Sequence, residues 1–303
     1  MPGIYFGPYS EQYSTYANAG NANLGRWPLG HTLILPDGRE YKFTLNDGTI
    51  EVAGNLYQSV AALTGHTDRP ADVARAIGAT AISGNITTTV AAADIYAEGV
   101  VHINDVTGEG YSYRIRRAMT AGAAHASAAS TAALTVNLDA GESVQVALDT
   151  TSEVTFTRNR YHRATIHLSP PTATLTGVSP GVAAADRFYW SQVKGYSAVL
   201  AQIGTLLAGL PVQAGTTTDG AVESYKRRVN STTTGSVLTA ATVYTFDLFD
   251  SDGNRSGLFG NVSVSTATVL DITGGIANRS PIVGTCVKAN GSTEYALIDL
   301  MIV

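Results

Sequence analysis

Apolar and polar residues alternate with a period of two in many short segments of this chain, and turn residues separate the segments at intervals of about 8–15 residues. The clearest case covers residues 33–45, where Tyr41, Phe43 and Leu45 alternate with polar side chains behind a Pro36-Asp37-Gly38 turn. A strand with this pattern buries one face and leaves the other in water. The sequence therefore predicts a mainly β chain with antiparallel sandwich or barrel-like domains and at most one or two short helices.

Changes in composition divide the chain into three expected parts. Residues 1–30 form an extended aromatic arm, residues 31–135 a β-rich domain, and residues 136–303 a second domain of sandwich or barrel type. A short helix is expected near residues 71–77, with Asp68 as its N-cap. No repeat of fixed period occurs, which argues against a propeller or a solenoid.

The arm combines aromatic side chains with glycine and proline residues that break any helical or strand period. Disordered linkers are poor in aromatic residues, so a segment this apolar has to lie against a protein surface. That surface is either the chain's own body or a neighbouring subunit, and we expect the neighbour. The candidate partner-binding residues are Tyr5, Phe6, Tyr9, Tyr13, Tyr16 and Trp27.

The last third of the chain is expected to contain four strands, over residues 237–249, 261–272, 282–288 and 294–303. The run from Tyr295 to the C-terminal valine is predicted to be a buried strand, because apolar residues dominate it.

Two carboxylates in this region resemble part of a calcium-binding loop. Asp250 and Asp252 flank a serine just before a glycine, and two carboxylates with a backbone carbonyl can chelate a hard cation. The acidic ligand that such a loop needs near its twelfth position is missing, because Asn261 and Val262 stand there. A hairpin turn explains the segment better, and we predict no metal site.

Charged residues make up 14% of the chain, against about 25% in an ordinary soluble domain. The formal net charge of −5 excludes a strongly basic nucleic-acid-binding protein. The single cysteine, Cys286, cannot pair within the chain, which excludes a disulfide-stapled scaffold. We find no secretory signal and no apolar run long enough to span a membrane, and we expect neither nucleic acid nor a membrane as a partner.

The search for catalytic motifs is negative. The chain has no phosphate-binding loop, no dinucleotide-binding glycine motif, no nucleophile elbow and no zinc-protease helix motif. The closest histidine pair, His162 and His167, is five residues apart, a spacing that suits neither one strand face nor one helix face. Cys286 lies in an apolar segment typical of a buried strand, and residues 114–117 form a basic cluster that is read as an exposed strand face. We therefore expect no enzymatic activity, no catalytic residue, no cofactor and no metal.

Three segments together are similar to a group of tailed-phage virion structural proteins encoded among head genes. They are LILPDGREYKFTL at residues 33–45, AEGVVHIN with GEGYSYRI between residues 97 and 115, and DRFYWSQVKG at residues 186–195. In that group a PDG-aromatic hairpin, a GEG-x-x-Y-x-I segment and an aromatic strand with tryptophan recur in this order. The resemblance covers roughly residues 25–220 and implies a capsid decoration, or cement, role without catalytic residues.

The resemblance implies a chain that is made in the host cytoplasm and then binds the outer surface of the major capsid shell, bridging capsomers. The expected partners are the major capsid protein and the chain itself, as a homotrimer. Low charge suits this role, because the cores of protein interfaces are poor in Lys, Glu and Asp. The alternatives left open are a phage tail, fibre or receptor-binding protein, a major capsid protein, and a polysaccharide-active enzyme.

Overall fold

The structure is a computed structural model and describes residues 3–18, 26–117, 125–126, 128–202, 206–225, 237–238, 243–249, 255–263, 268–269, 280–291 and 294–302. Two compact units are present, one made of Met1–Ser224 with Ser280–Val303 and the other of Tyr225–Arg279. The chain is mainly β, as the sequence predicts. In the described ranges the single helical element is a 3-10 helix, η1, at Tyr9–Tyr13.

A large mixed sheet forms the centre of the first unit, with the main strand order β1-β3-β4-β14-β22-β21-β15-β16. Four shorter strands join it beside this path through pairs of β5 with β12 and β13, and of β14 with β2 and β13. Its strands are β1 (Ile4–Phe6), β2 (Tyr16–Ala17), β3 (Thr32–Ile34), β4 (Glu40–Leu45), β5 (Leu56–Gln58), β12 (Thr165–Ile166), β13 (Leu175–Val178), β14 (Arg187–Leu200), β15 (Pro211–Ala214), β16 (Val222–Ser224), β21 (Ile282–Lys288) and β22 (Tyr295–Met301).

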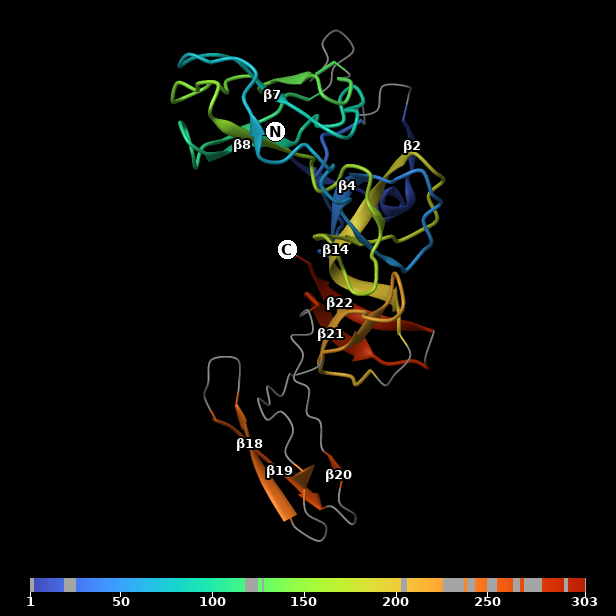
Figure 1. Ribbon diagram of the computed structural model, residues 1–303. Helices are drawn as coiled ribbons and strands as arrows, with labels where there is room; N and C mark the ends of the chain where they lie inside the picture. The colour runs from blue at the N-terminus through green and yellow to red at the C-terminus, as the bar shows by residue number, and fades with distance from the viewer. Residues whose placement is uncertain are drawn as a thin grey trace. The chain divides into compact units, whose positions relative to one another are not determined.

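The long strand β14 connects the two halves of this sheet, as Figure 1 shows in yellow between β4 and β22. Its first half pairs with β4 up to Lys194, and its second half pairs with β22 from Lys194 onward. The register shifts between Gln192 and Lys194, and Gly195 follows with a φ of +84°. A glycine adopts this left-handed backbone without steric cost, so β14 can bend at the point where its partner changes.

The predicted hairpin over residues 33–45 is confirmed. Strands β3 and β4 pair antiparallel with Thr32 opposite Lys42, and the reversal lies at Pro36-Asp37-Gly38. Alternate residues of β4 enter an aromatic core in which Phe43 stacks on Phe188 of β14, with ring centroids 5.2 Å apart. The alternation of apolar and polar residues in β4 therefore marks the face that the hairpin buries against β14.

A separate core lies within residues 69–157, where two smaller sheets have the orders β6-β11-β8-β9 and β10-β7. Apolar side chains such as Ile82, Val101 and Phe156 fill the space around them. The strands are β6 (Arg69–Pro70), β7 (Ala81–Asn85), β8 (Val100–Asp105), β9 (Ser112–Arg114), β10 (Ala133–Asn137) and β11 (Glu153–Thr157).

Two predictions about this region are wrong. The helix expected near residues 71–77 does not form, because Arg75 exchanges both of its backbone hydrogen bonds with Leu148 and Ala71 bridges to Gly84. The boundary expected between residues 135 and 136 falls inside β10, which pairs with β7. Non-local strand pairing satisfies these backbone groups, and neither a local cap nor a local composition change predicts it.

The second unit contains two antiparallel pairs, β17 (Val237–Leu238) with β20 (Thr268–Val269) and β18 (Val243–Phe249) with β19 (Arg255–Ser263). Strand β21 has the predicted bounds and β18 lies inside the predicted range 237–249, whereas β19 begins six residues before the predicted range 261–272 and shares only residues 261–263 with it. The predicted buried strand at the C-terminal end, β22, is covered on one face only. Its even-numbered residues from Ala296 to Leu300 are buried, whereas Tyr295 and Met301 are exposed.

Candidate interaction surfaces

Half of the predicted arm aromatics pack on the chain's own body. The Trp27 ring lies 5.2 Å from that of Trp190, 5.3 Å from Tyr5 and 5.4 Å from Tyr16, measured between centroids. Trp27 also makes an edge contact with Phe43 at 5.5 Å. For Tyr5, Tyr16 and Trp27 the surface is therefore this chain, where we had expected a neighbour.

Polar contacts also hold the arm to the body. Glu11 accepts hydrogen bonds from the Tyr16 hydroxyl and, at 3.1 Å, from Trp190 Nε1. Burial, supported by the hydrogen bond to Glu11, raises the pKa of Tyr16 to about 12. Further along, the Leu29 amide donates to the buried carboxylate of Glu98, which pairs with Arg117 at 2.9 Å. The arm is thus tied both to β14 and to the core of residues 69–157.

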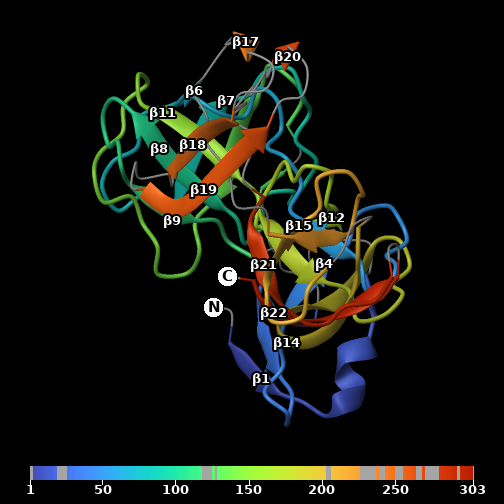
Figure 2. The ribbon, with the colours of Figure 1, turned by 90° about the horizontal axis from the view of Figure 1, so that it is seen from below.

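The other three arm aromatics, Phe6, Tyr9 and Tyr13, remain exposed. They lie on β1 and on η1, which follow each other in the chain and are drawn in blue in Figure 2. The structure therefore divides the six predicted residues into an anchoring group and an exposed group. Sequence alone does not separate them, because all six stand among the same glycines and prolines.

Strand β1 is the end strand of the large sheet and pairs with β3 alone among the strands described. Thr32 N donates to Gly3 O, and Gly7 N donates to Ile34 O, so the odd-numbered residues of this segment bond to β3. In a parallel ladder the residues between them turn their amide and carbonyl groups the other way. Among the residues that the structure describes, the outer side of β1 is therefore an open backbone edge.

The side chains on this edge are apolar. Ile4 is 64% exposed and Phe6 is 75% exposed. No charged residue occurs between Gly3 and Ser10. Natural sheets usually protect an open edge with charges, bulges or a covering segment, and an uncharged apolar edge is a ready site for pairing with another chain. We call Ile4, Phe6 and the outer backbone of β1 the open edge.

A second feature is a groove of about 430 Å³ on the same unit, which we call the tyrosine groove. Its walls come from η1, from the turn before β5, from the segment after β13, and from β14 and β22. Tyr13, Tyr196 and Tyr295 line it with exposed fractions between 42% and 61%. The polar residues at the groove are Gln12, Arg39, Gln192, Ser179 and Ser197.

Arg39 is the single charged residue among those lining this groove. Its Nε lies 2.7 Å from Asp37 Oδ2, and its Nη1 donates to Gln12 Oε1 at 2.9 Å and to the Tyr41 hydroxyl at 3.0 Å. These contacts neutralise the charge of Arg39 and hold its guanidinium and the Gln12 amide in place. Of the three tyrosines, only Tyr13 was a predicted site residue, as part of the arm. Tyr196 and Tyr295 were not predicted, although the alternation of β22 places Tyr295 opposite its buried residues.

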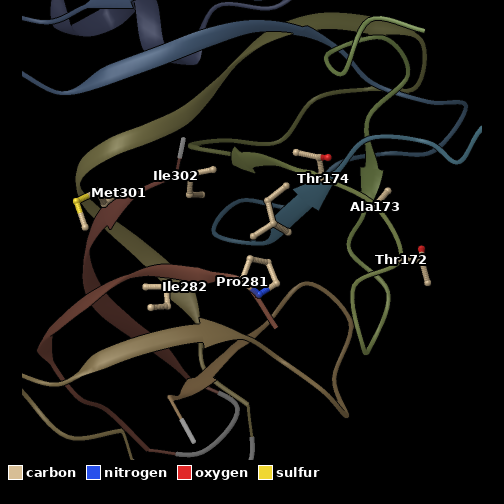
Figure 3. A pocket seen from close by; sticks show the side chains of 8 residues that line it. Thr172, Ala173, Thr174, Pro281, Ile282, Met301 and Ile302 are labelled. Carbon is tan, nitrogen blue, oxygen red and sulfur yellow. The ribbon is translucent and has the colours of Figure 1, made fainter. Parts of the chain in front are cut away.

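A third feature is an apolar groove of about 610 Å³, which Figure 3 shows from close by. Pro281, Ile282, Met301 and Ile302 form one side, and residues 172–175 form the other. Its lining residues include no titratable side chain, so it offers shape and apolar area and no acid–base chemistry.

Three buried titratable groups, Glu51, His66 and His125, line neither groove, although Glu51 directly precedes the lining residue Val52 and interacts with the lining residue Ser179. Glu51 is buried, and this burial raises the pKa of its carboxyl well above the usual value, against the influence of the Tyr189 hydroxyl. His66 and His125 are also buried, and burial lowers the pKa of each. The Tyr96 hydroxyl lies 2.6 Å from His66 Nδ1 and the Tyr96 amide donates to His125 Nε2 at 3.1 Å. These groups join neighbouring segments through polar contacts inside the protein.

Within the described ranges, no group of three or more His, Cys, Asp or Glu residues is placed to hold a metal ion. His162 and His167 are both buried, as is Cys286, whose thiol pKa is raised by burial. Asp250 and Asp252 lie outside the described residues. In the part of the chain that the structure covers, no helix is long and apolar enough to cross a membrane.

The basic cluster predicted on an exposed strand face is partly paired. Arg114 of β9 lies 3.2 Å from Asp139, and Arg117 pairs with Glu98 as described above. The cluster therefore does not present a row of unpaired cations.

No protein-family model matches the chain, and no curated protein or solved structure shows a significant similarity to it.

Proposed function

We propose that this chain is a capsid decoration, or cement, protein of a tailed bacteriophage, which binds the outer surface of the major capsid shell and bridges capsomers as a homotrimer. The observation that carries the proposal is the open edge of β1, an uncharged strand with two exposed apolar side chains. A bridging protein needs such a surface, because strand addition supplies backbone hydrogen bonds and apolar contact in one step. The resemblance of residues 25–220 to virion structural proteins supports the same role.

The open edge can contribute usefully to binding. Full burial of a side chain such as Ile4 or Phe6 is worth about 1.5–3 kcal/mol relative to exposure. Ordering and desolvation costs reduce that gain, so one edge binds weakly by itself. A trimer carries three edges, and after the first contact the second and third form at high effective concentration. Weak single contacts that reinforce one another therefore favour an oligomer that binds a regular lattice of identical sites.

The first test is the number of copies in purified virions, measured by gel densitometry against the major capsid protein. A cement protein is present in amounts on the order of hundreds, in proportion to the capsid subunits, whereas a tail, fibre or receptor-binding protein is present in roughly three to eighteen copies. The lower number contradicts the capsid role and supports the tail alternative.

The second test uses Phe6→Asp in the full chain, with Ile77→Asp as a matched control. Ile77 is 68% exposed and lies in the turn region between β6 and β7, outside the large sheet that β1 ends. We expect Phe6→Asp to abolish co-sedimentation with capsids stripped of this protein, because a charge at the open edge opposes pairing. Ile77→Asp retains binding. Equal binding by both variants contradicts the proposed contact, and a monomer in light scattering at micromolar concentration contradicts the trimer.

A further inference from the structure

We propose that the tyrosine groove binds a neutral oligosaccharide. Its three tyrosines come from segments far apart in the chain, namely η1, the middle of β14 and the start of β22. An exposed aromatic ring offers a flat apolar face with a hydroxyl at its tip, and a pyranose ring offers a flat face of C–H groups surrounded by hydroxyls. This inference concerns a different surface from the open edge and does not depend on the capsid role.

The backbone sets the position of the tyrosine rings. Gly54 has a φ of +77°, and a Cβ built on it would lie 2.5 Å from Cε1 of Tyr295. The Tyr295 ring therefore rests directly against the backbone of residue 54, which holds the floor of the groove close to β22. Tyr196 directly follows Gly195 at the bend of β14 and is 58% exposed. The Tyr295 ring, held against Gly54, loses little entropy when a ligand stacks on it.

The amides of Gln12 and Gln192 are held in place by hydrogen bonds within the chain, and Arg39 retains donors for a ligand. Gln12 Nε2 donates to the Tyr9 carbonyl at 2.8 Å, and Gln192 Nε2 donates to the Tyr196 carbonyl at 3.0 Å. Arg39 uses its Nε and Nη1 groups on Asp37, Gln12 and Tyr41, and none of the described residues accepts from its Nη2. A guanidinium carries five N–H donors, so two remain for a hydroxyl oxygen.

The electrostatics favour a neutral ligand over an anion. Arg39 is the only charged residue of the lining, and Asp37 already pairs with it at 2.7 Å. A site for phosphate or carboxylate groups would present a cation without such a partner. Hydroxyl groups, in contrast, can accept from Arg39 Nη2 and exchange hydrogen bonds with tyrosyl and seryl hydroxyls.

The sheet topology limits strand addition at the groove without closing it. Strand β22 pairs with β14 and β21, so both of its edges are occupied. Strand β14 pairs with β4 up to Lys194 and with β22 from Lys194 onward, and its last residue, Leu200, donates its amide to Gly54 O. An extended peptide along β14 is therefore an outcome that the test has to separate from a saccharide. A proline-rich peptide, which binds aromatic grooves through its own helix, remains as an outcome of the test.

The test measures binding of the full chain to maltohexaose, cellohexaose, mannohexaose and xylohexaose by calorimetry and saturation-transfer NMR. We expect saturable binding of at least one of them with a dissociation constant of about 1 mM or tighter. Tyr196→Ala weakens that binding at least about tenfold, whereas Tyr196→Phe keeps the ring and stays within about threefold. The control is Tyr111→Ala, since Tyr111 is exposed to a similar degree but stacks on Tyr113 of β9.

Three results overturn the proposal. The first is an absence of saturable binding for all four hexaoses at about 10 mM, the limit at which such affinities are measurable. The second is equal binding by the wild-type chain and Tyr196→Ala. The third is binding of decaproline that Tyr196→Ala abolishes while no saccharide binds, which would make the groove a peptide site.

Discussion

Replacing Trp27 by alanine tests how the arm is held in the isolated protein. The indole of Trp27 contacts four Trp, Tyr or Phe rings, with centroid distances of 5.2 Å to Trp190, 5.3 Å to Tyr5, 5.4 Å to Tyr16 and 5.5 Å to Phe43, and it also stacks on the His31 imidazole at 6.3 Å. Aromatic pairs are worth at least about 0.5 kcal/mol each beyond the area they bury, so the four contribute about 2 kcal/mol. The half-buried indole adds about 1–2 kcal/mol of apolar burial.

We therefore expect Trp27→Ala to lower the free energy of unfolding of this core by about 3–4 kcal/mol, within the range of about 3–5 kcal/mol for large aromatic truncations. Urea titration followed by tryptophan fluorescence measures it directly. The chain has two tryptophans, so the variant leaves Trp190 as the sole reporter, in the same aromatic core.

The control is Phe6→Ala, which removes an aromatic side chain of the same arm that is exposed on β1. We expect this variant to stay within about 0.5 kcal/mol of the wild type. A loss below about 1 kcal/mol for Trp27→Ala would refute the reasoning, because the arm would then need a neighbour to hold it.

Two more predictions concern protonation and backbone conformation. The pKa of His66 and of His125 is lowered in the folded state by burial, so below about pH 6.5 the unfolded chain takes up protons that the folded chain does not. Stability then falls as pH falls, by up to about 1.4 kcal/mol per pH unit for each histidine. Urea midpoints at pH 7.5 and 5.5 measure the slope, which His66→Gln reduces; an unchanged slope contradicts the assignment. Gly54→Ala costs more than Gly38→Ala in the same assay, because both have positive φ but only Gly54 meets Tyr295. Equal costs contradict the contact.

The regions that sequence predicted well are those in which neighbouring residues carry the information. The hairpin of β3 and β4 follows from a Pro-Asp-Gly turn and from alternation within residues 33–45, and both act over a few residues. The helix expected near residues 71–77 failed although its cap signals were present. The backbone amide and carbonyl of Arg75 bond to Leu148, and this pairing depends on the packing of a segment far away in the sequence.

For the interaction surfaces, too, one part was predictable from the sequence and another depended on tertiary packing. The sequence identified an apolar, charge-poor arm, and the structure separated its anchoring residues from the exposed ones by stacking Trp27 on Trp190. Composition cannot make this separation, because it depends on which rings fit the existing core.

What the sequence by itself determined is the β character of the chain, the local turns and the aromatic content of the arm, because turn chemistry and alternation act between near neighbours. Only the tertiary structure decided that β1 ends the sheet and that Tyr13, Tyr196 and Tyr295 share one groove. The order of strands depends on burial across the whole sheet, and the bend of β14 at Gly195 brings its two partners together. Contacts between residues so far apart in the chain exist only once that packing is complete.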